Sequence, residues 1–264
     1  GSMSTNIVTG NDNTAIGRLA YTSGTSGNQN IAIGTEALGK NTSGSKNIAI
    51  GSFTLNTNTT GSNSIAIGDS ALFAHANTYP EIAIGARALK NSSAGEFNIA
   101  IGPDALYSNN NNSASIAIGN QALYTQSYIL PIYTHNIAIG SHALYRNSPI
   151  SFTTGRYNTA LGSFAMRNNT SGYQNTAVGY SALRGDDFTG SNSYFNTAVG
   201  FSALRNIADD TYSNTAVGHS ALENNTTGFS NVGLGLNSLN MNTIGNENTA
   251  IGADSPDTKL AIDL

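Results

Sequence analysis

The sequence predicts an all-β protein, a parallel β-solenoid of about fourteen 17-residue coils, from three observations. A short phrase, seen as Asn30-Ile31-Ala32-Ile33-Gly34, recurs fourteen times along the 264 residues. Most copies lie 17 residues apart, which is too short for the two helices of a helical repeat. β-Branched residues fill the phrase and Gly, Asn, Ser and Thr fill the segments between copies, as expected for short strands joined by turns.

The last glycine of each phrase sets the phase of the array. The first six steps between these marker glycines are 17 residues, and the later steps are 21, 22, 17, 21, 18, 17 and 17. A constant period with local insertions indicates a solenoid that keeps its strands and carries the additions as loops. Residues are numbered below relative to the marker, so position −1 directly precedes it and position +1 directly follows it. The marker glycines are Gly17, Gly34, Gly51, Gly68, Gly85, Gly102, Gly119, Gly140, Gly162, Gly179, Gly200, Gly218, Gly235 and Gly252.

The phrase alternates in the manner of a strand with two faces. Position −1 is always aliphatic and position −3 is Ile, Thr or Val, while position −2 is Ala, with Gly233 as the exception. Alternation places positions −3 and −1 on one face. We expect these columns, with the leucines of a second strand such as Ala37-Leu38, to fill a thin core. The Ala column would then pack against a neighbouring chain, and the reverse assignment is the alternative. The Thr residues that occupy position −3 from Thr159 onward are expected at the rim of the core.

Asparagine opens most copies at position −4. In stacked coils these side chains would lie above one another about 4.8 Å apart, where their amides can hydrogen-bond along the stack. We interpret this column as structural, with a glycosylation or ligand role as the minor alternative. Its members include Asn13, Asn30, Asn47, Asn98, Asn136, Asn158, Asn175, Asn214 and Asn248.

The array divides the chain into three parts. Residues 1–12 form a leader whose Gly1-Ser2-Met3 start resembles an expression scar. Residues 13–256 form the repeat array, and residues 257–264 form an alternating exit strand that could open a further domain. The predicted loop insertions are residues 124–135, 145–157, 184–195 and 205–213.

The composition narrows the functional classes. Charged residues make up only 10% of the chain and the net charge is −4, which argues against nucleic acid as a partner. No stretch approaches the ~20 apolar residues of a membrane span, so no membrane insertion is expected. The chain has no cysteine, which is compatible with an extracellular fibre. A coil this thin buries little core, so association with copies of the chain is expected to add apolar burial.

Two copies carry a family resemblance. The segments Asn175-Thr176-Ala177-Val178-Gly179-Tyr180-Ser181-Ala182-Leu183 and Asn214-Thr215-Ala216-Val217-Gly218-His219-Ser220-Ala221-Leu222 resemble the repeats of bacterial and phage tail-fibre-type proteins, which often precede a self-cleaving chaperone domain. The phrase is also similar, more distantly, to the heads of YadA-like trimeric autotransporter adhesins. The resemblance covers residues 13–256. It implies a left-handed solenoid, a homotrimer, and a place on the cell surface or on a virion tail fibre.

Aromatic residues in the insertions are the candidate ligand-binding residues. Exposed aromatics on a polar fibre are typical of sugar or protein contact surfaces, so a surface glycan or a receptor protein is the expected partner. In the alternative, the rings cover the open edge of the coils or pack between chains. The candidates are Tyr124, Tyr128, Tyr133, Tyr145, Phe152 and Tyr157.

Acidic pairs in two later insertions are the candidate metal ligands. Asp186 and Asp187 lie one coil before Asp209 and Asp210, and stacked carboxylates are suitable oxygen ligands for Ca²⁺. The alternative is a solvated acidic loop neutralised by neighbouring arginines. No other cofactor is expected, because the glycines follow no phosphate-binding pattern.

These observations favour a non-enzymatic extracellular fibre segment that acts as a rigid shaft or an adhesive head. One alternative is an ice-binding solenoid, since Thr159, Thr176, Thr197 and Thr215 form a column. A flat ice-binding face, however, is expected to carry paired Thr columns. The other is a polysaccharide-degrading β-helix enzyme, which would need the Asp186, Asp187, Asp209 and Asp210 carboxylates along a groove.

Overall fold

The structure is a computed structural model that describes residues 10–75, 79–147, 153–185, 192–208 and 210–255. The chain forms two compact units, Gly1–Thr134 and His135–Leu264, here called the first and second units. Among the described residues every regular element is a β-strand. The all-β prediction is therefore confirmed.

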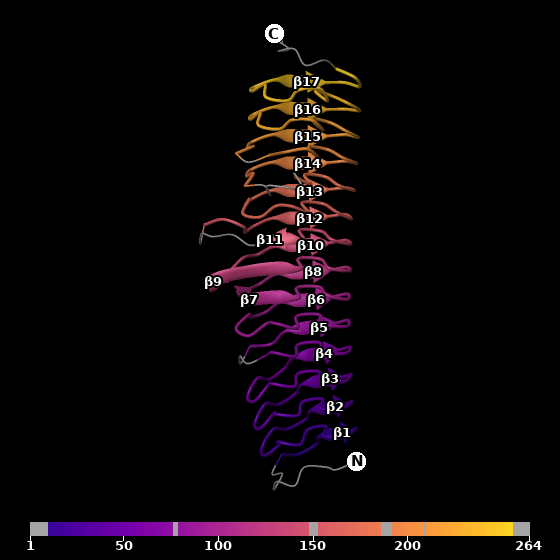
Figure 1. The fold of residues 1–264 in the computed structure, drawn as a ribbon, viewed down its shortest axis with the longest axis vertical. Helices are drawn as coiled ribbons and strands as arrows, with labels where there is room; N and C mark the ends of the chain where they lie inside the picture. The colour runs from indigo at the N-terminus through magenta and orange to yellow at the C-terminus, as the bar shows by residue number, and fades with distance from the viewer. Residues whose placement is uncertain (1–9, 76–78, 148–152, 186–191, 209, 256–264) are drawn as a thin grey trace. The chain divides into compact units, whose positions relative to one another are not determined.

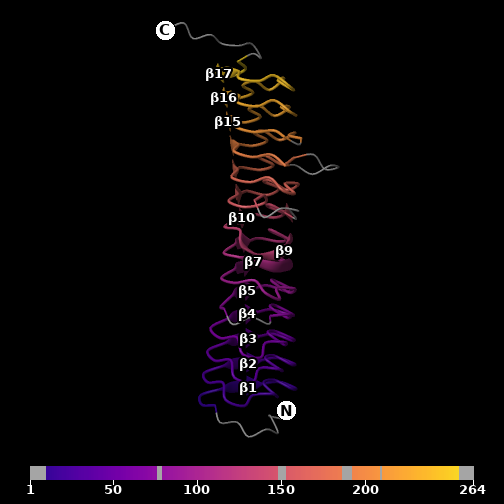
Figure 2. The same ribbon diagram turned by 90° about the vertical axis from the view of Figure 1, so that its left-hand side faces the viewer.

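Each unit is a parallel β-solenoid in which every coil contributes one three-residue strand from the repeated phrase. Figures 1 and 2 show the strands of each unit stacked as rungs. Neighbouring strands pair residue for residue, so that Ala15 lies opposite Ala32 and Ala160 opposite Ala177. The phased glycines therefore lie one above the next within each unit, as the 17-residue period predicts.

The strand bounds follow the phrase closely. In the first unit they are β1 (Thr14–Ile16), β2 (Ile31–Ile33), β3 (Ile48–Ile50), β4 (Ile65–Ile67), β5 (Ile82–Ile84), β6 (Ile99–Ile101) and β8 (Ile116–Ile118), with β7 (Ser108–Ser113) pairing in parallel with β9 (Thr125–Tyr133) beside them. In the second unit they are β10 (Ile137–Ile139), β11 (Arg146–Asn147), β12 (Thr159–Leu161), β13 (Thr176–Val178), β14 (Thr197–Val199), β15 (Thr215–Val217), β16 (Val232–Leu234) and β17 (Thr249–Ile251).

The Ala-Leu segment is a run of turns, and the prediction of a second strand there was wrong. Two of its residues have left-handed backbone angles in nearly every coil, such as Arg87 at position +2 with φ 59° and Leu89 at position +4 with φ 49°. Among the residues that the structure describes, no non-glycine residue with positive φ is Val, Ile or Thr. A second branch at Cβ makes this conformation a genuine outlier, which explains why position +4 carries Leu where the strand carries Ile.

The two faces of the strand are the reverse of the main expectation. The Ala column at position −2 is fully buried, as at Ala32 and Ala83, whereas Ile50 is 36% exposed and Ile251 is 59% exposed. The Ala column therefore lies inside the coil, and positions −3 and −1 point outward, including the Thr residues that were expected at the core's rim. The alternative assignment that the sequence left open is the one the structure adopts.

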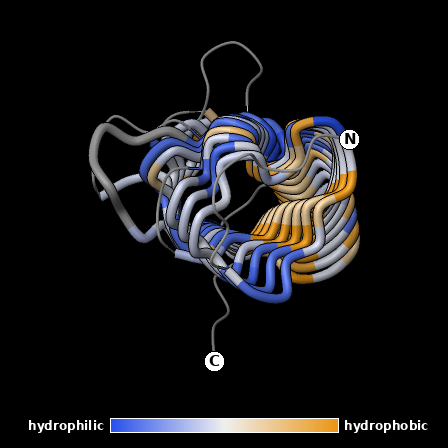
Figure 3. The backbone as a smooth tube through the Cα atoms, turned by 90° about the horizontal axis from the view of Figure 1, so that it is seen from below, coloured by the Kyte–Doolittle hydropathy of each residue, from blue (hydrophilic) through white to orange (hydrophobic). Residues whose placement is uncertain are grey.

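The inside of the coil is narrow, which explains the restriction to Ala and Gly. A Cβ built on Gly233 would lie 3.0 Å from Oγ of Ser238 and 3.3 Å from Cγ of Leu222, a buried +4 leucine. The Ala column and the Leu column thus face each other across the coil, and a larger residue at position −2 would displace the leucine. In Figure 3 the strongly apolar residues of the described coils lie mainly on one side.

The marker glycine allows successive coils to approach closely. Gly34 has φ 133°, and a Cβ there would lie 2.4 Å from the carbonyl oxygen of Gly51 in the next coil. Only glycine accepts both the backbone angle and this close approach. The marker glycine is therefore required twice, which explains its strict recurrence.

The asparagine column forms the predicted amide ladder. The backbone N–H of Asn47 donates to Oδ1 of Asn30 at 3.0 Å, and Nδ2 of Asn30 donates to the carbonyl of Gly44 at 2.8 Å. A second buried column at position +7, which the sequence analysis missed, repeats the pattern, with Nδ2 of Asn58 donating to Oδ1 of Asn41 at 2.9 Å. The hydrogen bonds of both columns help to hold neighbouring coils in register.

Candidate interaction surfaces

The predicted binding aromatics of the first unit contact residues outside the predicted set. Tyr124 is half-buried and stacks on Tyr107 with ring centroids 5.1 Å apart. Tyr133 is 51% exposed and its hydroxyl donates to Oε2 of Glu96 at 3.3 Å. The charge of Glu96 raises the pKa of the Tyr133 phenol. Tyr128 belongs to β9, and its side chain lies outside the described part of the structure.

The predicted aromatics of the second unit also have partners of their own. Tyr145 lies 5.3 Å from the ring of His142, and Tyr157 stacks on His135 with centroids 5.5 Å apart. The Arg156 guanidinium lies 5.3 Å from the centroid of the Tyr157 ring, in range of a cation–π contact. Phe152 lies outside the described residues. Tyr157, at 46% exposed, is the best candidate in this unit for contact with a partner.

The predicted calcium ligands fall mostly outside the described residues. Asp186, Asp187 and Asp209 are not among those that the structure describes, and Asp210 is exposed. Within the described ranges, no group of three or more His, Cys, Asp and Glu residues is arranged to hold a metal ion. Calcium binding at these loops stays a prediction.

A column of stacked rings at position −6 of the second unit was not predicted. Tyr173, Tyr194, Tyr212 and Phe229 lie nearly parallel, with centroid separations of 5.1, 5.1 and 4.8 Å and interplanar angles of 6, 2 and 6°. Burial and the neighbouring phenols raise the pKa of Tyr194. Each coil supplies one ring and the strand register aligns them, so alignment of the copies on the marker glycine could have found the column.

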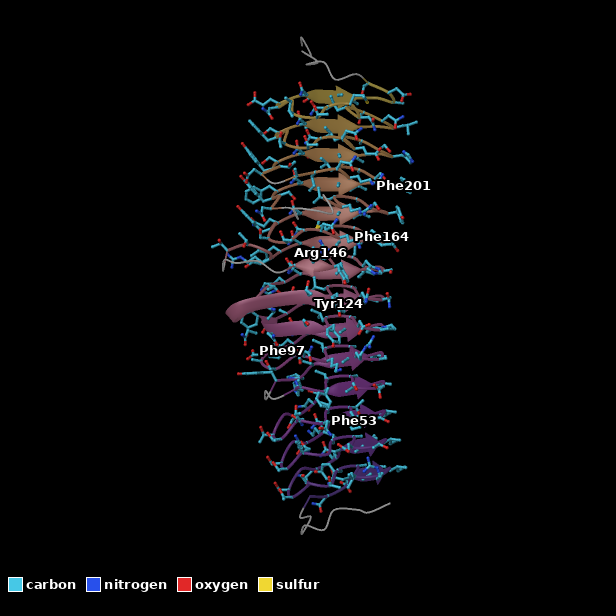
Figure 4. The ribbon with its side chains drawn as sticks, viewed as in Figure 1. Phe53, Phe97, Tyr124, Arg146, Phe164 and Phe201 are labelled. Atoms are coloured by element: carbon cyan, nitrogen blue, oxygen red, sulfur yellow. The ribbon has the colours of Figure 1, made fainter. Side chains whose placement is uncertain are left out.

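A second aromatic column lies just after the marker glycines of this unit, at positions +1 and +2. Tyr180 stacks on Phe201 at 5.2 Å and Phe201 on His219 at 5.0 Å, while Phe164 meets Tyr180 edge-on at 5.6 Å. Tyr180 and Phe201 are 48% and 49% exposed. Figure 4 shows Phe164 and Phe201 at the same edge of the ribbon.

His142 extends the second column at one end. Its ring stacks on Phe164 with centroids 5.3 Å apart. Burial, and secondarily the positive charge of Arg167, lower the pKa of His142 from its ordinary value of 6.5. The neutral imidazole is therefore the form that this environment favours.

A buried cluster in the first unit contains the side-chain types of a Ser-His-acid triad. Nε2 of His75 lies 3.4 Å from Oγ of Ser64, and Nδ1 of His75 lies 3.1 Å from Oε2 of Glu81. Oγ of Ser92 and Nδ2 of Asn98 also donate to the Glu81 carboxylate, at 3.0 and 2.7 Å. Three neighbouring side chains therefore hold the Glu81 carboxyl group in place.

The surroundings of this cluster give it a structural role. The side chains of His75 and Glu81 are both 0% exposed, so a substrate has no access to the Ser64 hydroxyl. Ser64 and Glu81 occupy the −4 column and His75 and Ser92 the +7 column, where other coils place Asn. The cluster thus replaces part of the two amide ladders.

Comparison with known proteins gives no match: no family model, curated protein or solved structure is similar to this chain. The tail-fibre and adhesin resemblance accordingly stays a hypothesis carried by the repeated phrase. In the part of the chain that the structure describes, no helix has the length and apolarity to cross a membrane.

Proposed function

We propose that this chain is a non-enzymatic segment of an extracellular fibre, a rigid shaft that presents aromatic columns to a partner on a surface. The observation that carries the proposal is the unbroken register of parallel strands in each unit. Every coil repeats the same backbone bonds to the coil above and below it. Such a design resists bending within a unit and offers the same side chains at regular intervals.

The buried interior supports a mechanical task. Besides the strand bonds, each coil is tied to the next through the two amide ladders and through the close contact of marker glycines. Sliding one coil past another would break all of these contacts together. Many of the interior polar groups hydrogen-bond from one coil to the next, which supports a shaft over a catalyst.

The aromatic columns supply the adhesive part of the proposal. In the −6 column the stacked rings cover one another's faces, so their edges and the hydroxyls of Tyr173, Tyr194 and Tyr212 are what a partner meets. Phenol hydroxyls donate and accept hydrogen bonds, and ring edges bear partial positive charge. A surface glycan or a receptor protein with many hydroxyl and carbonyl oxygens fits this chemistry.

Adhesion is tested by binding of the labelled protein to a glycan array and to panels of bacterial and animal cells. We expect binding that Tyr194→Ala with Tyr212→Ala reduces at least tenfold, because both substitutions remove rings from the middle of the column. Phe97→Ala with Tyr79→Ala, which removes a ring pair with centroids 5.3 Å apart in the first unit, is the matched control and should bind as the wild type does. Equal loss in both variants, or no binding to any surface, would contradict adhesion through the −6 column.

One observation keeps the ice-binding function as a second candidate. The Thr column of the second unit points outward beside an outward aliphatic column, as at Thr197 and Val199 in β14. Hydroxyl and methyl groups repeated on a flat strand face suit an ordered water lattice better than an inward Thr column would. A thermal-hysteresis measurement decides this candidate: a freezing-point gap that Thr197→Lys abolishes would favour it over the fibre.

A further inference from the structure

Three tyrosines of the −6 column present the same reactive atoms in register from one coil to the next. Tyr173 forms a parallel backbone bridge with Tyr194, and Tyr194 forms one with Tyr212. The ring planes differ by only 6° and 2°, and the centroids are 5.1 Å apart in both pairs. Because the rings are alike and leave paired backbone positions, each is related to the next almost by a translation along the stack. Corresponding ring carbons are therefore about as far apart as the centroids.

The column repeats a phenol where a stack requires only a flat ring. Phenylalanine serves equally well for stacking, as Phe229 does on Tyr212 at a centroid separation of 4.8 Å. The shared chemistry of the other three rings is thus not explained by packing. In the part of the chain that the structure describes, two tyrosine rings stack on each other in the pairs Tyr107–Tyr124, Tyr173–Tyr194 and Tyr194–Tyr212.

The three phenols are accessible and yet held next to each other. All three tyrosines are partly exposed, whereas the leucines inside the coil, such as Leu204, are fully buried. The N–H of Tyr194 donates to the carbonyl of Thr211 at 3.2 Å, and the N–H of Ser213 donates to the carbonyl of Tyr194 at 3.2 Å. The backbone therefore keeps successive rings together, while a partly exposed ring can change its side-chain torsions without displacing the core.

Neighbouring phenols of this kind are substrates for oxidative coupling to dityrosine. A haem peroxidase with hydrogen peroxide, as the one-electron oxidant, removes one electron and the hydroxyl proton from each of two phenols. Each phenoxyl radical carries unpaired spin on its Cε carbons, and the two radicals combine to form a Cε–Cε bond. The hydrogens on those two carbons then move to the oxygens, which restores both phenols. The pair loses two hydrogen atoms in total, and hydrogen peroxide takes them up to become two molecules of water.

A dityrosine link would close one coil covalently. Tyr194 and Tyr212 lie one coil apart, so the link would encircle a loop of about the length of one repeat. A covalent link across such a loop restricts the unfolded chain and lowers the opening equilibrium roughly a hundredfold. The chain has no cysteine, so a disulfide cannot supply this link.

We propose that Tyr173, Tyr194 and Tyr212 form a site of oxidative modification, where a peroxidase-type oxidant joins the tyrosines of successive coils as dityrosine. The alignment of the phenols, their exposure and the backbone bridges between them direct the coupling to neighbours within one chain. This inference goes beyond the proposed fibre function and does not rest on it, because the reaction requires only the folded coils.

The test treats the full chain with a haem peroxidase and hydrogen peroxide at several protein concentrations, followed by trypsin and mass spectrometry. Trypsin cleaves after Arg184 and Arg205, which places the three tyrosines in three different peptides. We expect peptide 185–205 to be joined to 206–259 or to 168–184, with the loss of two hydrogens and the fluorescence of dityrosine. The yield should be independent of protein concentration, because the partners belong to one chain.

Two conservative variants identify the site. Tyr194→Phe keeps the ring stack, since Phe229 already occupies this column, and removes the phenol that both pairs share, so both links should be lost. Tyr180→Phe is the matched control in the same unit: Tyr180 is 48% exposed and stacks on Phe201, which has no phenol to couple, so the variant should keep the wild-type yield. Links in the wild type that persist in Tyr194→Phe would overturn the proposal. So would a yield that falls on dilution, or peptide 185–205 joined mainly to itself, which requires two chains.

Discussion

Replacing Leu89 with Ile tests the left-handed turns that build each coil. Leu89 is fully buried at position +4 and has φ 49°, and its N–H donates to the carbonyl of Ala105 in the next coil at 3.0 Å. The substitution keeps volume and apolarity and only moves a methyl group onto Cβ. In an ordinary core such a swap costs less than about 1.5 kcal/mol.

The expected cost here is larger because of the backbone. A side chain with one Cβ substituent already loses about 1–2 kcal/mol in the left-handed region, and a second substituent on Cβ adds a penalty of the same order. With the shape change, Leu89→Ile should destabilise its coil by roughly 2–3 kcal/mol. That corresponds to an opening equilibrium about 30- to 140-fold higher.

Amide hydrogen exchange measures the opening equilibrium of a single coil, which suits a repeat protein whose coils do not all open together. The amides of Leu89 and Leu106, which bond coil to coil, should exchange faster by about that factor. Leu89→Met is the matched control, because Met166 occupies the same position with φ 49°, and its exchange should stay within a few-fold of the wild type. Equal protection in the Ile and Met variants would refute the argument from backbone angle.

Three further predictions concern the glycines, the buried cluster and pH. Gly85→Ala should lower the free energy of unfolding by about 3 kcal/mol or more. In Gly252→Ala the φ is also positive, at 125°, but no atom lies within 4 Å of the added Cβ, so only the backbone part of that cost is expected. Thermal unfolding of the two variants measures the difference. Glu81→Ala should cost about 1–3 kcal/mol by leaving the buried side chains that contact its carboxyl group without that partner. His75→Asn with Glu81→Asn should recover most of this cost by restoring the amide ladder, and urea unfolding of the single and double variants measures both effects. Because the folded state lowers the pKa of His142 below 6.5, unfolding takes up a proton in that window, so stability should fall as pH drops below 6.5. His142→Phe should reduce the dependence of stability on pH below 6.5. If the pH dependence is unchanged in this variant, it arises from other titratable groups.

The sequence was sufficient for the architecture because a strict period constrains it strongly. Fourteen marker glycines at near-constant spacing allow only a stack of short coils, and parallel register then follows from identical neighbours. The amide ladder at position −4 was equally predictable, since Asn residues placed one above another in a buried column have few other partners.

The inside and outside of the strand could not be assigned from alternation. Alternation says that Ala32 and Ile33 face opposite ways, but not which one faces the core. The deciding fact is that the Leu38 column crosses the interior and fills it, so only Ala fits opposite. The absence of β-branched residues at position +4 was visible in the sequence and indicated a turn, although it was taken for a second strand.

The candidate surfaces were predicted only in part. Insertion aromatics such as Tyr133 and Tyr157 are exposed as expected. The stacked column through Tyr194 arises from one ring per coil, so it becomes visible in the sequence only when the copies are aligned on the marker glycine. The Ser64–His75–Glu81 cluster joins positions −4 and +7, which meet only when the coil closes. No spacing along the chain reveals that these two columns are neighbours.

The residue-for-residue pairing of neighbouring strands has a consequence for how such a gene can change. Because a coil presents the same donors, acceptors and glycine contact above and below, removing one 17-residue unit from the run between Gly17 and Gly51 joins two ends that already fit. Recombination between copies would therefore lengthen or shorten the protein in whole steps while sparing its interior chemistry. Length is then a trait that selection can adjust without first solving a new folding problem.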